Sequence, residues 1–198
     1  MKIINLFQGD DSLKKEFYCW VDHDFFMADH NYRIGSFIDI KTAPNEKYLM
    51  FIIDPDFSGF ISPFHRGVLN NYGVEYNLEL GRINFFQNYP SRLASIFLLE
   101  SEEEAFKYRD RHLMHVGKRI LRKGITSGPY EYSRHDSSWV DFLRLDGWKE
   151  PETINNVNRT YWAGGTVEEN GLTHFGKPWS QAPIFEILYS GRIDFIKS

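Results

Sequence analysis

The segment Pro90 to Ala105, PSRLASIFLLESEEEA, places Arg92 in a loop directly before a short apolar run. The run at 96–99 has the length of a buried strand, and Ser101 stands three residues before Glu104, the spacing of a helix capping box. Loops at such junctions commonly carry ligand-binding groups. The segment predicts a loop, a strand and a capped helix, with Arg92 either in a binding site or solvated at an ordinary junction.

A second polar cluster alternates histidine and aspartate in VDHDFFMADH. Its members are Asp22, His23, Asp24, Asp29 and His30. These residue types bind metals, but their spacing fits none of the usual zinc-ligand patterns. The chain has seven histidines, so a cluster of this kind arises readily by chance. We predict a polar loop here and no metal site.

A third candidate is a basic run that contains a single acid, Asp110. The run comprises Lys107, Arg109, Arg111, Lys118, Arg119, Arg122 and Lys123. Such a strip can follow a nucleic-acid backbone, and rings at Tyr108, His112 and Tyr130 could stack on bases. The alternative is a solvated face balanced by the acidic SEEE just upstream. The sequence leaves both interpretations open.

Composition and missing signatures narrow the class of protein. A chain of 198 residues suits one domain, and a net charge of −4 argues against wholesale binding of phosphate backbones. Cys19 is the only cysteine, which excludes an intrachain disulfide and favours a cytoplasmic location. The sequence has no membrane-length apolar run, signal-peptide core, Walker loop, GxGxxG, GxSxG or HExxH motif. We expect an intracellular protein that is neither a P-loop hydrolase nor a Rossmann oxidoreductase.

The elements that must position these residues mix strands and helices without regular alternation. Strands are predicted over 16–21, 32–40, 47–53, 96–99, 118–123, 130–134, 183–189 and 193–197. The turns 124–129 and 190–191 would each join two of them. Helices are predicted over 74–86, 101–112, 136–145 and 150–162, the last bracketed by Pro151 and Gly164. We predict one α+β domain over 1–198, with a mixed or antiparallel sheet.

Several short motifs occur along the chain in a definite order. FYCW (17–20) precedes Arg82 and PSRLASIF (90–97), then HDSSW (135–139), then YWAGG (161–165) leading into PIFEILYSG (183–191). Together they resemble the ADP-ribosyltransferase superfamily, specifically a bacterial and phage group of small ADP-ribosyltransferase-like domains. The resemblance covers most of the chain. It implies a split antiparallel β core with flanking helices, which bends NAD⁺ in a cleft and transfers its ADP-ribose with loss of nicotinamide.

The resemblance also implies which side chains perform the chemistry. Glu186 matches the catalytic glutamate, whose carboxylate bonds a ribose hydroxyl, stabilises the oxocarbenium-like transition state and orients the acceptor. Tyr18 or Trp20 would stack on nicotinamide. We expect Glu186 and Tyr18 to be catalytic, and Trp20 to bind NAD⁺.

Four further residues are implied to bind NAD⁺. Arg92, beside Ser91, would grip the pyrophosphate bidentately, and Ser95 would bond the nicotinamide ribose or carboxamide. Arg82 is the fourth. No metal is implied.

The first motif departs from the family at one position. Where the family places a histidine in its first strand, this chain has Cys19. An alternative alignment uses FHRG (64–67), with His65 or Arg66 holding NAD⁺. We prefer the alignment on 17–20, because it leaves the usual number of residues between the first motif and PSRLAS (90–95).

The expected function is mono-ADP-ribosylation of a protein or nucleic acid by a toxin or phage-defence effector, with a neutralising antitoxin protein as a further partner and no membrane. Two alternatives remain open. One is a catalytically silent ADP-ribosyltransferase-like binding module, which the substitution at Cys19 favours. The other is an enzyme similar to RNA 2′-phosphotransferases, which the basic run favours. The residues do not identify the acceptor.

Overall fold

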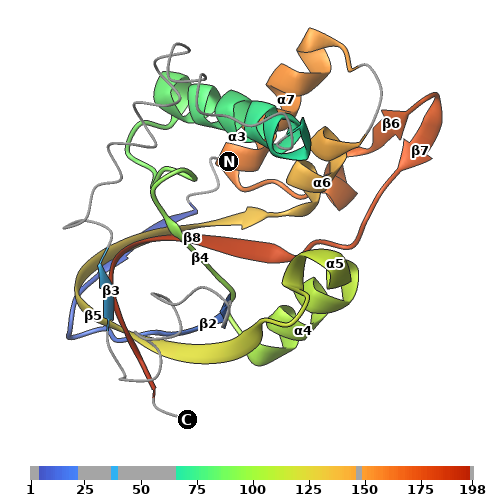
Figure 1. The fold of residues 1–198 in the computed structure, drawn as a ribbon. Helices are drawn as coiled ribbons and strands as arrows, with labels where there is room; N and C mark the ends of the chain where they lie inside the picture. The colour runs from blue at the N-terminus through green and yellow to red at the C-terminus, as the bar shows by residue number, and fades with distance from the viewer. Residues whose placement is uncertain (1–4, 22–36, 40–65, 146–148, 197–198) are drawn as a thin grey trace. The chain divides into compact units, whose positions relative to one another are not determined.

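Figure 1 presents a computed structural model of the chain, which describes residues 5–21, 37–39, 66–145 and 149–196, with 37–39 and 66–72 as backbone only. The chain divides into two compact units. The helical unit comprises 1–5, 44–94 and 135–183, and the β unit comprises 6–43, 95–134 and 184–198. Helices combine with antiparallel strands, so the α+β class is confirmed. The prediction of one domain over 1–198 stays a prediction.

The β unit is built on two long neighbouring strands, β5 (Ile120–Asp136) and β8 (Phe185–Phe195). β1 (Leu6–Gly9) pairs with β5 along 130–133, and β2 (Glu16–Val21) pairs with it along 120–125. β4 (Ile96–Leu98) and β3 (Phe37–Asp39) pair with β8 along 187–189 and 192–194. Each long strand therefore exchanges one partner for another midway along its length (Figure 1).

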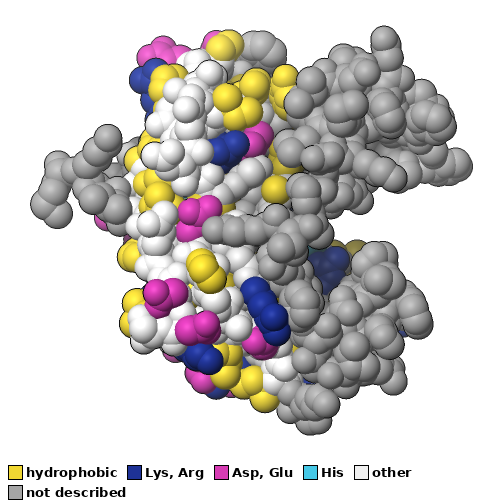
Figure 2. Space-filling view, turned by 90° about the vertical axis from the view of Figure 1, so that its left-hand side faces the viewer, with side chains coloured by type: hydrophobic (Ala, Val, Ile, Leu, Met, Phe, Trp, Pro, Cys, Tyr) yellow, Lys and Arg dark blue, Asp and Glu magenta, His cyan; other side chains and the backbone are white. Residues whose placement is uncertain are grey.

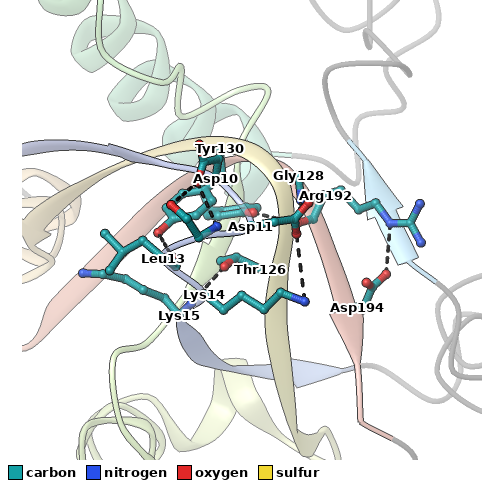
Figure 3. A network of polar contacts seen from close by, with 12 residues as sticks. Asp10, Asp11, Leu13, Lys14, Lys15, Thr126, Gly128, Tyr130, Arg192 and Asp194 are labelled. Carbon is teal, nitrogen blue, oxygen red and sulfur yellow. Dashed lines mark hydrogen bonds and ion pairs between the residues drawn. The ribbon is translucent and has the colours of Figure 1, made fainter.

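The predicted hairpin around 124–129 is wrong, because β5 continues through it. The segment 126–129 lies between the stretches that pair with β2 and with β1, and the β1–β2 connection bonds it instead (Figure 3). Lys15 N donates to Thr126 Oγ1 over 2.9 Å, and Gly128 N donates to Asp11 Oδ1 over 3.0 Å. Gly128 has φ +68°, which favours glycine. Here glycine marks a bend within a strand.

The predicted turn at 190–191 is wrong for a related reason. β8 runs unbroken from Phe185 to Phe195, and Gly191 lies in it with φ +144°. A Cβ atom at Gly191 would stand 2.9 Å from Tyr130 Cβ and 3.0 Å from the Pro129 carbonyl oxygen. The glycine is needed because β5 approaches β8 closely at this point.

A cluster of buried side chains fills the β unit. It comprises Phe17, Cys19, Val21, Leu98, Tyr130, Tyr132, Ile187, Tyr189, Ile193 and Phe195. An isolated bridge between Tyr18 and Leu99 links β2 to β4, with N–H to O distances of 2.9 and 2.8 Å. The circuit β2–β5–β8–β4 is thereby closed around this core.

Two helices complete the β unit. α4 (Glu102–Arg111) begins after Ser101, whose Oγ accepts a hydrogen bond from Glu104 N over 3.1 Å, so the predicted cap is confirmed. The four-residue α5 (Leu113–Val116) follows and was not predicted. α4 packs beside β2, and Trp20 Nε1 donates to the Ala105 carbonyl oxygen over 3.1 Å.

The helical unit packs α3 (Arg66–Phe85) against α6 (Ser138–Arg144) and α7 (Pro151–Ala163). α7 has Pro151 at its start and Gly164 at its end with φ +80°, as predicted. α3 begins eight residues earlier than predicted. Within it, Gly81 admits α7 closely, because a Cβ there would lie 3.3 Å from Asn158 Cβ. Tertiary packing thus outweighs the low helix propensity of glycine.

The remaining elements are short. α8 (Val167–Asn170) precedes a two-stranded hairpin of β6 (Leu172–His174) and β7 (Lys177–Trp179), none of which was predicted. The predicted strand over 47–53, and most of the one over 32–40, lie outside the described residues. Among the helices that the structure describes, none is long and apolar enough to cross a membrane.

Candidate functional site

Glu186 lies in β8 and is 7% exposed. Its neighbour Ile187, and Tyr189 two residues further, belong to the core of the β unit. Because successive side chains of a strand point to opposite faces, Glu186 and Leu188 face away from that core. We call this side the outer face of the sheet.

The register between β4 and β8 extends this outer face. Leu98 stands opposite Ile187, and both belong to the core, whereas Phe97 stands opposite Leu188 on the outer face. Continued by one residue, the same antiparallel register puts Leu99 opposite Glu186. This extension of the register makes Leu99, the residue after β4, the expected neighbour of Glu186.

Tyr18 shares this face. Phe17 and Cys19 on either side of it are core residues, so Tyr18 points outward. Tyr18 and Leu99 exchange both backbone hydrogen bonds, which places them directly opposite each other. Tyr18 and Glu186 are thus separated by one strand, about 10 Å of sheet at the usual strand spacing.

Lys123 ends the row on its far side, because β5 places it opposite Tyr18. Its Nζ lies 2.7 Å from Glu16 Oε2, and this hydrogen bond raises the pKa of Lys123. The outer face therefore carries, from strand to strand, Lys123, Tyr18, Leu99 and Glu186. Cation, phenol, apolar side chain and carboxylate stand in sequence along it.

Two members of this row, the Glu186 carboxylate and the Tyr18 phenol, are groups that can stabilise a positive charge. A carboxylate held away from water acts on nearby charge through a lower effective dielectric constant than bulk solvent has. The phenol of Tyr18 offers both a ring face and a hydroxyl. The predicted catalytic residues Glu186 and Tyr18 come together on one face; their catalytic role stays a prediction.

Trp20 also points outward from β2, but its side chain packs against α4. Besides its bond to Ala105, its ring meets Phe106 edge-on at 6.1 Å between centroids, and the Arg109 guanidinium lies 6.0 Å from it. These contacts join β2 to α4. A contact of Trp20 with NAD⁺ stays a prediction.

Arg92 lies in the helical unit and is 4% exposed. Its Nε donates to Glu75 Oε2 over 2.5 Å, its Nη2 to Glu75 Oε1 over 3.0 Å, and its Nη1 to the Tyr161 hydroxyl over 2.5 Å. Arg144 Nη2 also donates to Glu75 Oε1, over 3.2 Å. Arg92 thus makes a bidentate contact, but with a carboxylate of its own chain.

Electrostatics in this cluster favour the ion pair. Burial alone would raise the pKa of the Glu75 carboxyl, but Arg92 and Arg144 outweigh burial and hold the pKa below its ordinary value. Glu75 is therefore ionised at neutral pH. The predicted binding of pyrophosphate by Arg92 stays a prediction, and it would have to compete with Glu75.

Two of the segments that carry the resemblance meet beside Arg92. The His135 ring stacks on Tyr161 at 4.4 Å between centroids, with Nδ1 2.8 Å from the Tyr161 carbonyl oxygen, and burial lowers the pKa of His135 to about 3. Asp136 accepts from Ser138 N over 3.0 Å and from Val167 N over 2.9 Å. HDSSW and YWAGG thus hold the helical unit together.

The other predicted NAD⁺-binding residues have local roles. Arg82 bonds Glu79 bidentately and donates to the Gln87 and Tyr89 carbonyl oxygens over 3.0 and 3.1 Å, which ties down the end of α3. Ser91 Oγ accepts from Leu93 N over 3.2 Å. Ser95 immediately precedes β4 and is half-buried.

Some predictions fall outside the described residues. They concern the cluster at 22–30, Phe64 and His65, and the side chain of Arg66. Within the part of the chain that the structure describes, no group of three or more His, Cys, Asp or Glu side chains is placed to hold a metal ion.

Sequence reasoning missed Glu75, Tyr161 and Leu99. Glu75 and Arg92 are 17 residues apart, and Leu99 acquires its place only through two strand registers.

Comparison with models of protein families gave no match, and comparison with curated protein sequences gave none either.

Proposed function

We propose that this protein is an NAD⁺-dependent ADP-ribosyltransferase in which Glu186 is the catalytic carboxylate and Tyr18 contacts the nicotinamide end of NAD⁺. The observation that supports the proposal most is the shared outer face of β2, β4 and β8, which brings these two residues to either side of Leu99. They are 168 positions apart in sequence, and the resemblance assigned both to the same reaction.

The proposed reaction needs a fixed anion more than it needs a strong base. The bond between ribose C1′ and the nicotinamide nitrogen breaks, nicotinamide leaves with the electron pair, and the ribose becomes an oxocarbenium-like cation. An acceptor nucleophile then attacks C1′, forms the new bond and gives up its proton to water. Glu186 would stabilise the cation, which exists only once the bond is breaking, and would orient the ribose through a hydroxyl.

The sheet supports the same proposal at the level of architecture. The resemblance implies a split antiparallel β core, and in the β unit each of the two long strands pairs with one short strand along one half and with another along the other half. We propose that this arrangement is an ADP-ribosyltransferase-like core.

Roles for Arg92 and the antitoxin partner follow less directly. We propose that Arg92 first of all fixes the loop before β4 by its bonds to Glu75 and Tyr161. We further propose that the transferase activity is toxic to a host cell, and that a partner protein neutralises this toxicity.

The test is release of nicotinamide from NAD⁺ by the purified protein, followed by chromatography. We expect turnover by the wild type, a small loss in Tyr18→Phe, which keeps the ring, and a larger loss in Tyr18→Ala. Glu100→Gln, an exposed carboxylate bonded to Arg134 next to β4, is the matched control and should turn over NAD⁺ normally. A wild type that binds NAD⁺ without releasing nicotinamide would favour the silent binding module instead.

A further inference from the structure

The basic charge of this acidic protein is gathered in one short segment. Residues 107–123 hold seven of the 23 lysines and arginines but one of the 27 acidic residues. The segment forms the end of α4, all of α5 and the start of β5 in the β unit. On the face of the molecule in Figure 2, by contrast, Lys and Arg side chains lie next to Asp and Glu side chains.

Three of the seven cations are compensated locally. Lys107 Nζ lies 2.9 Å from Glu103 and 3.1 Å from Glu104, Arg109 bonds its neighbour Asp110, and Lys123 bonds Glu16. These pairs lie on exposed surface and contribute little to binding an anion. The seven cations therefore do not form the continuous basic strip that the sequence suggests, because three of them are paired with carboxylates.

The remaining charge is concentrated where α5 leads into β5. Among the residues that the structure describes, no carboxylate contacts Lys118, Arg119 or Arg122. Arg119 Nη1 lies 3.2 Å from His115 Nε2, and Lys118 is exposed. This part of the segment keeps a net positive charge that an anionic ligand can use.

Aromatic rings lie next to these cations. The Tyr108 ring is 4.5 Å from the His112 ring and 6.4 Å from the His115 ring, centroid to centroid. Leu113 and Met114 between the histidines are 63% and 98% exposed. Cations that contact phosphates beside rings and apolar side chains that contact unpaired bases are the features of proteins that bind single strands.

We propose that the α4–α5 corner, defined as residues 108–119, binds the phosphate backbone of a single-stranded nucleic acid, which is then the acceptor of ADP-ribose. The identity of the acceptor rests on the proposed transferase function, whereas the binding surface does not. Charge complementarity selects a polyanion, and the adjacent rings select one with unpaired bases.

An anionic membrane is a weaker occupant of the same corner. Helices that lie in a membrane interface bury a long apolar face, and α5 has four residues with two exposed aliphatic side chains. Binding to a membrane would also leave the rings of Tyr108 and His112 without a role. Vesicles nevertheless provide a useful negative probe.

The binding experiment is fluorescence anisotropy with labelled oligouridylate and oligothymidylate of about 20 nucleotides, long enough for one binding site. The variant Lys118→Gln/Arg119→Gln removes two phosphate contacts. We expect weaker binding and a slope of log affinity against log salt that is shallower by about 1.4, the value for two contacts with a single strand. The control Lys14→Gln/Arg192→Gln removes the same charge from ion pairs elsewhere in the β unit (Figure 3) and should bind as the wild type does.

Each outcome bears on a different claim. Equal affinity and slope in the variant and the wild type would overturn the surface, as would binding to phosphatidylserine vesicles with none to either oligonucleotide. Incubation with labelled NAD⁺ then tests the acceptor: we expect nuclease, and not protease, to release the label. Oligonucleotide binding without any NAD⁺ turnover would leave the surface standing and contradict the proposed transferase. NAD⁺ turnover without labelling of the oligonucleotides would overturn the acceptor alone.

Discussion

Two nearly buried charges, Arg92 in the helical unit and Glu186 in the β unit, contrast in their surroundings. The fold supplies Arg92 with a bidentate carboxylate and a phenol hydroxyl, all within the helical unit. Glu186 instead lies in the β unit, in β8, on the sheet face that also carries Leu188. Burial of charge is costly, so removing a paired, buried arginine should destabilise the unit that contains it. We therefore expect loss of Arg92 to affect stability, and we propose that loss of Glu186 affects the reaction.

The largest stability effect should come from Arg92→Ala. Breaking a fully buried pair costs about 3–5 kcal/mol, but Glu75 is only partly buried and keeps its bond to Arg144. We expect chemical denaturation to report a loss towards the lower end of this range. Lys107→Ala, which breaks solvent-exposed pairs on α4, should cost far less. Equal losses in the two variants would remove Arg92 from the stabilising core.

Calorimetry can decide whether Arg92 has a second role. Arg92→Lys retains the charge but loses the fork that grips a pyrophosphate. Weaker NAD⁺ binding in a folded Arg92→Lys protein would support the role that the resemblance implies. Unchanged affinity would limit Arg92 to its bonds with Glu75 and Tyr161.

His135 should make the helical unit sensitive to acid. Burial lowers its pKa from 6.5 to about 3, so the unfolded chain binds a proton below pH 6.5 that the folded chain does not. Stability is therefore complete above pH 6.5 and falls on acidification towards pH 3, by at most about 1.4 kcal/mol per pH unit from this group. Denaturation curves between pH 7 and 5 measure the slope. A His135→Asn variant with the same slope would exclude His135 as its source.

The smallest effect is a gain in stability at the tip of the β6–β7 hairpin. Phe175 and Gly176 form a two-residue turn with φ +50° and +73°, and Phe175 is 76% exposed. Such turns favour Asn-Gly, because a bulky residue at positive φ is strained. Phe175→Asn should stabilise the fold by about 0.5–1 kcal/mol in thermal unfolding. Phe175→Val, which is branched at Cβ, should destabilise it; a reversed order would refute the strain.

Local signals predicted a large part of the fold. The bounds of β2 agree with the predicted 16–21, and the Ser101 cap and the Pro151–Gly164 bracket were read directly from sequence. Each depends on neighbouring residues alone. The errors at Gly124–Pro129 and Gly191 arose because a glycine that ends a strand and one that lets two strands approach have the same sequence signature.

The candidate site was predictable in part. Glu186 and Tyr18 were chosen by resemblance. The place of Leu99 could not be predicted in the same way, because it depends on the registers of β2 with Leu99 and of β4 with β8. The ion pair of Glu75 with Arg92 likewise depends on the packing of α3. Long-range pairing is the information that periodicity and capping do not contain.

The central claim is that Glu186 acts in chemistry and not in holding the fold. Its most direct test is nicotinamide release by Glu186→Gln, with NAD⁺ affinity and thermal unfolding measured on the same sample. An amide keeps the shape of the side chain but has no charge for the developing cation, so we expect turnover to fall by roughly 10²–10³-fold or more, with affinity and unfolding nearly unchanged. A Glu186→Gln protein that folds, binds NAD⁺ and releases nicotinamide at the wild-type rate would contradict the claim.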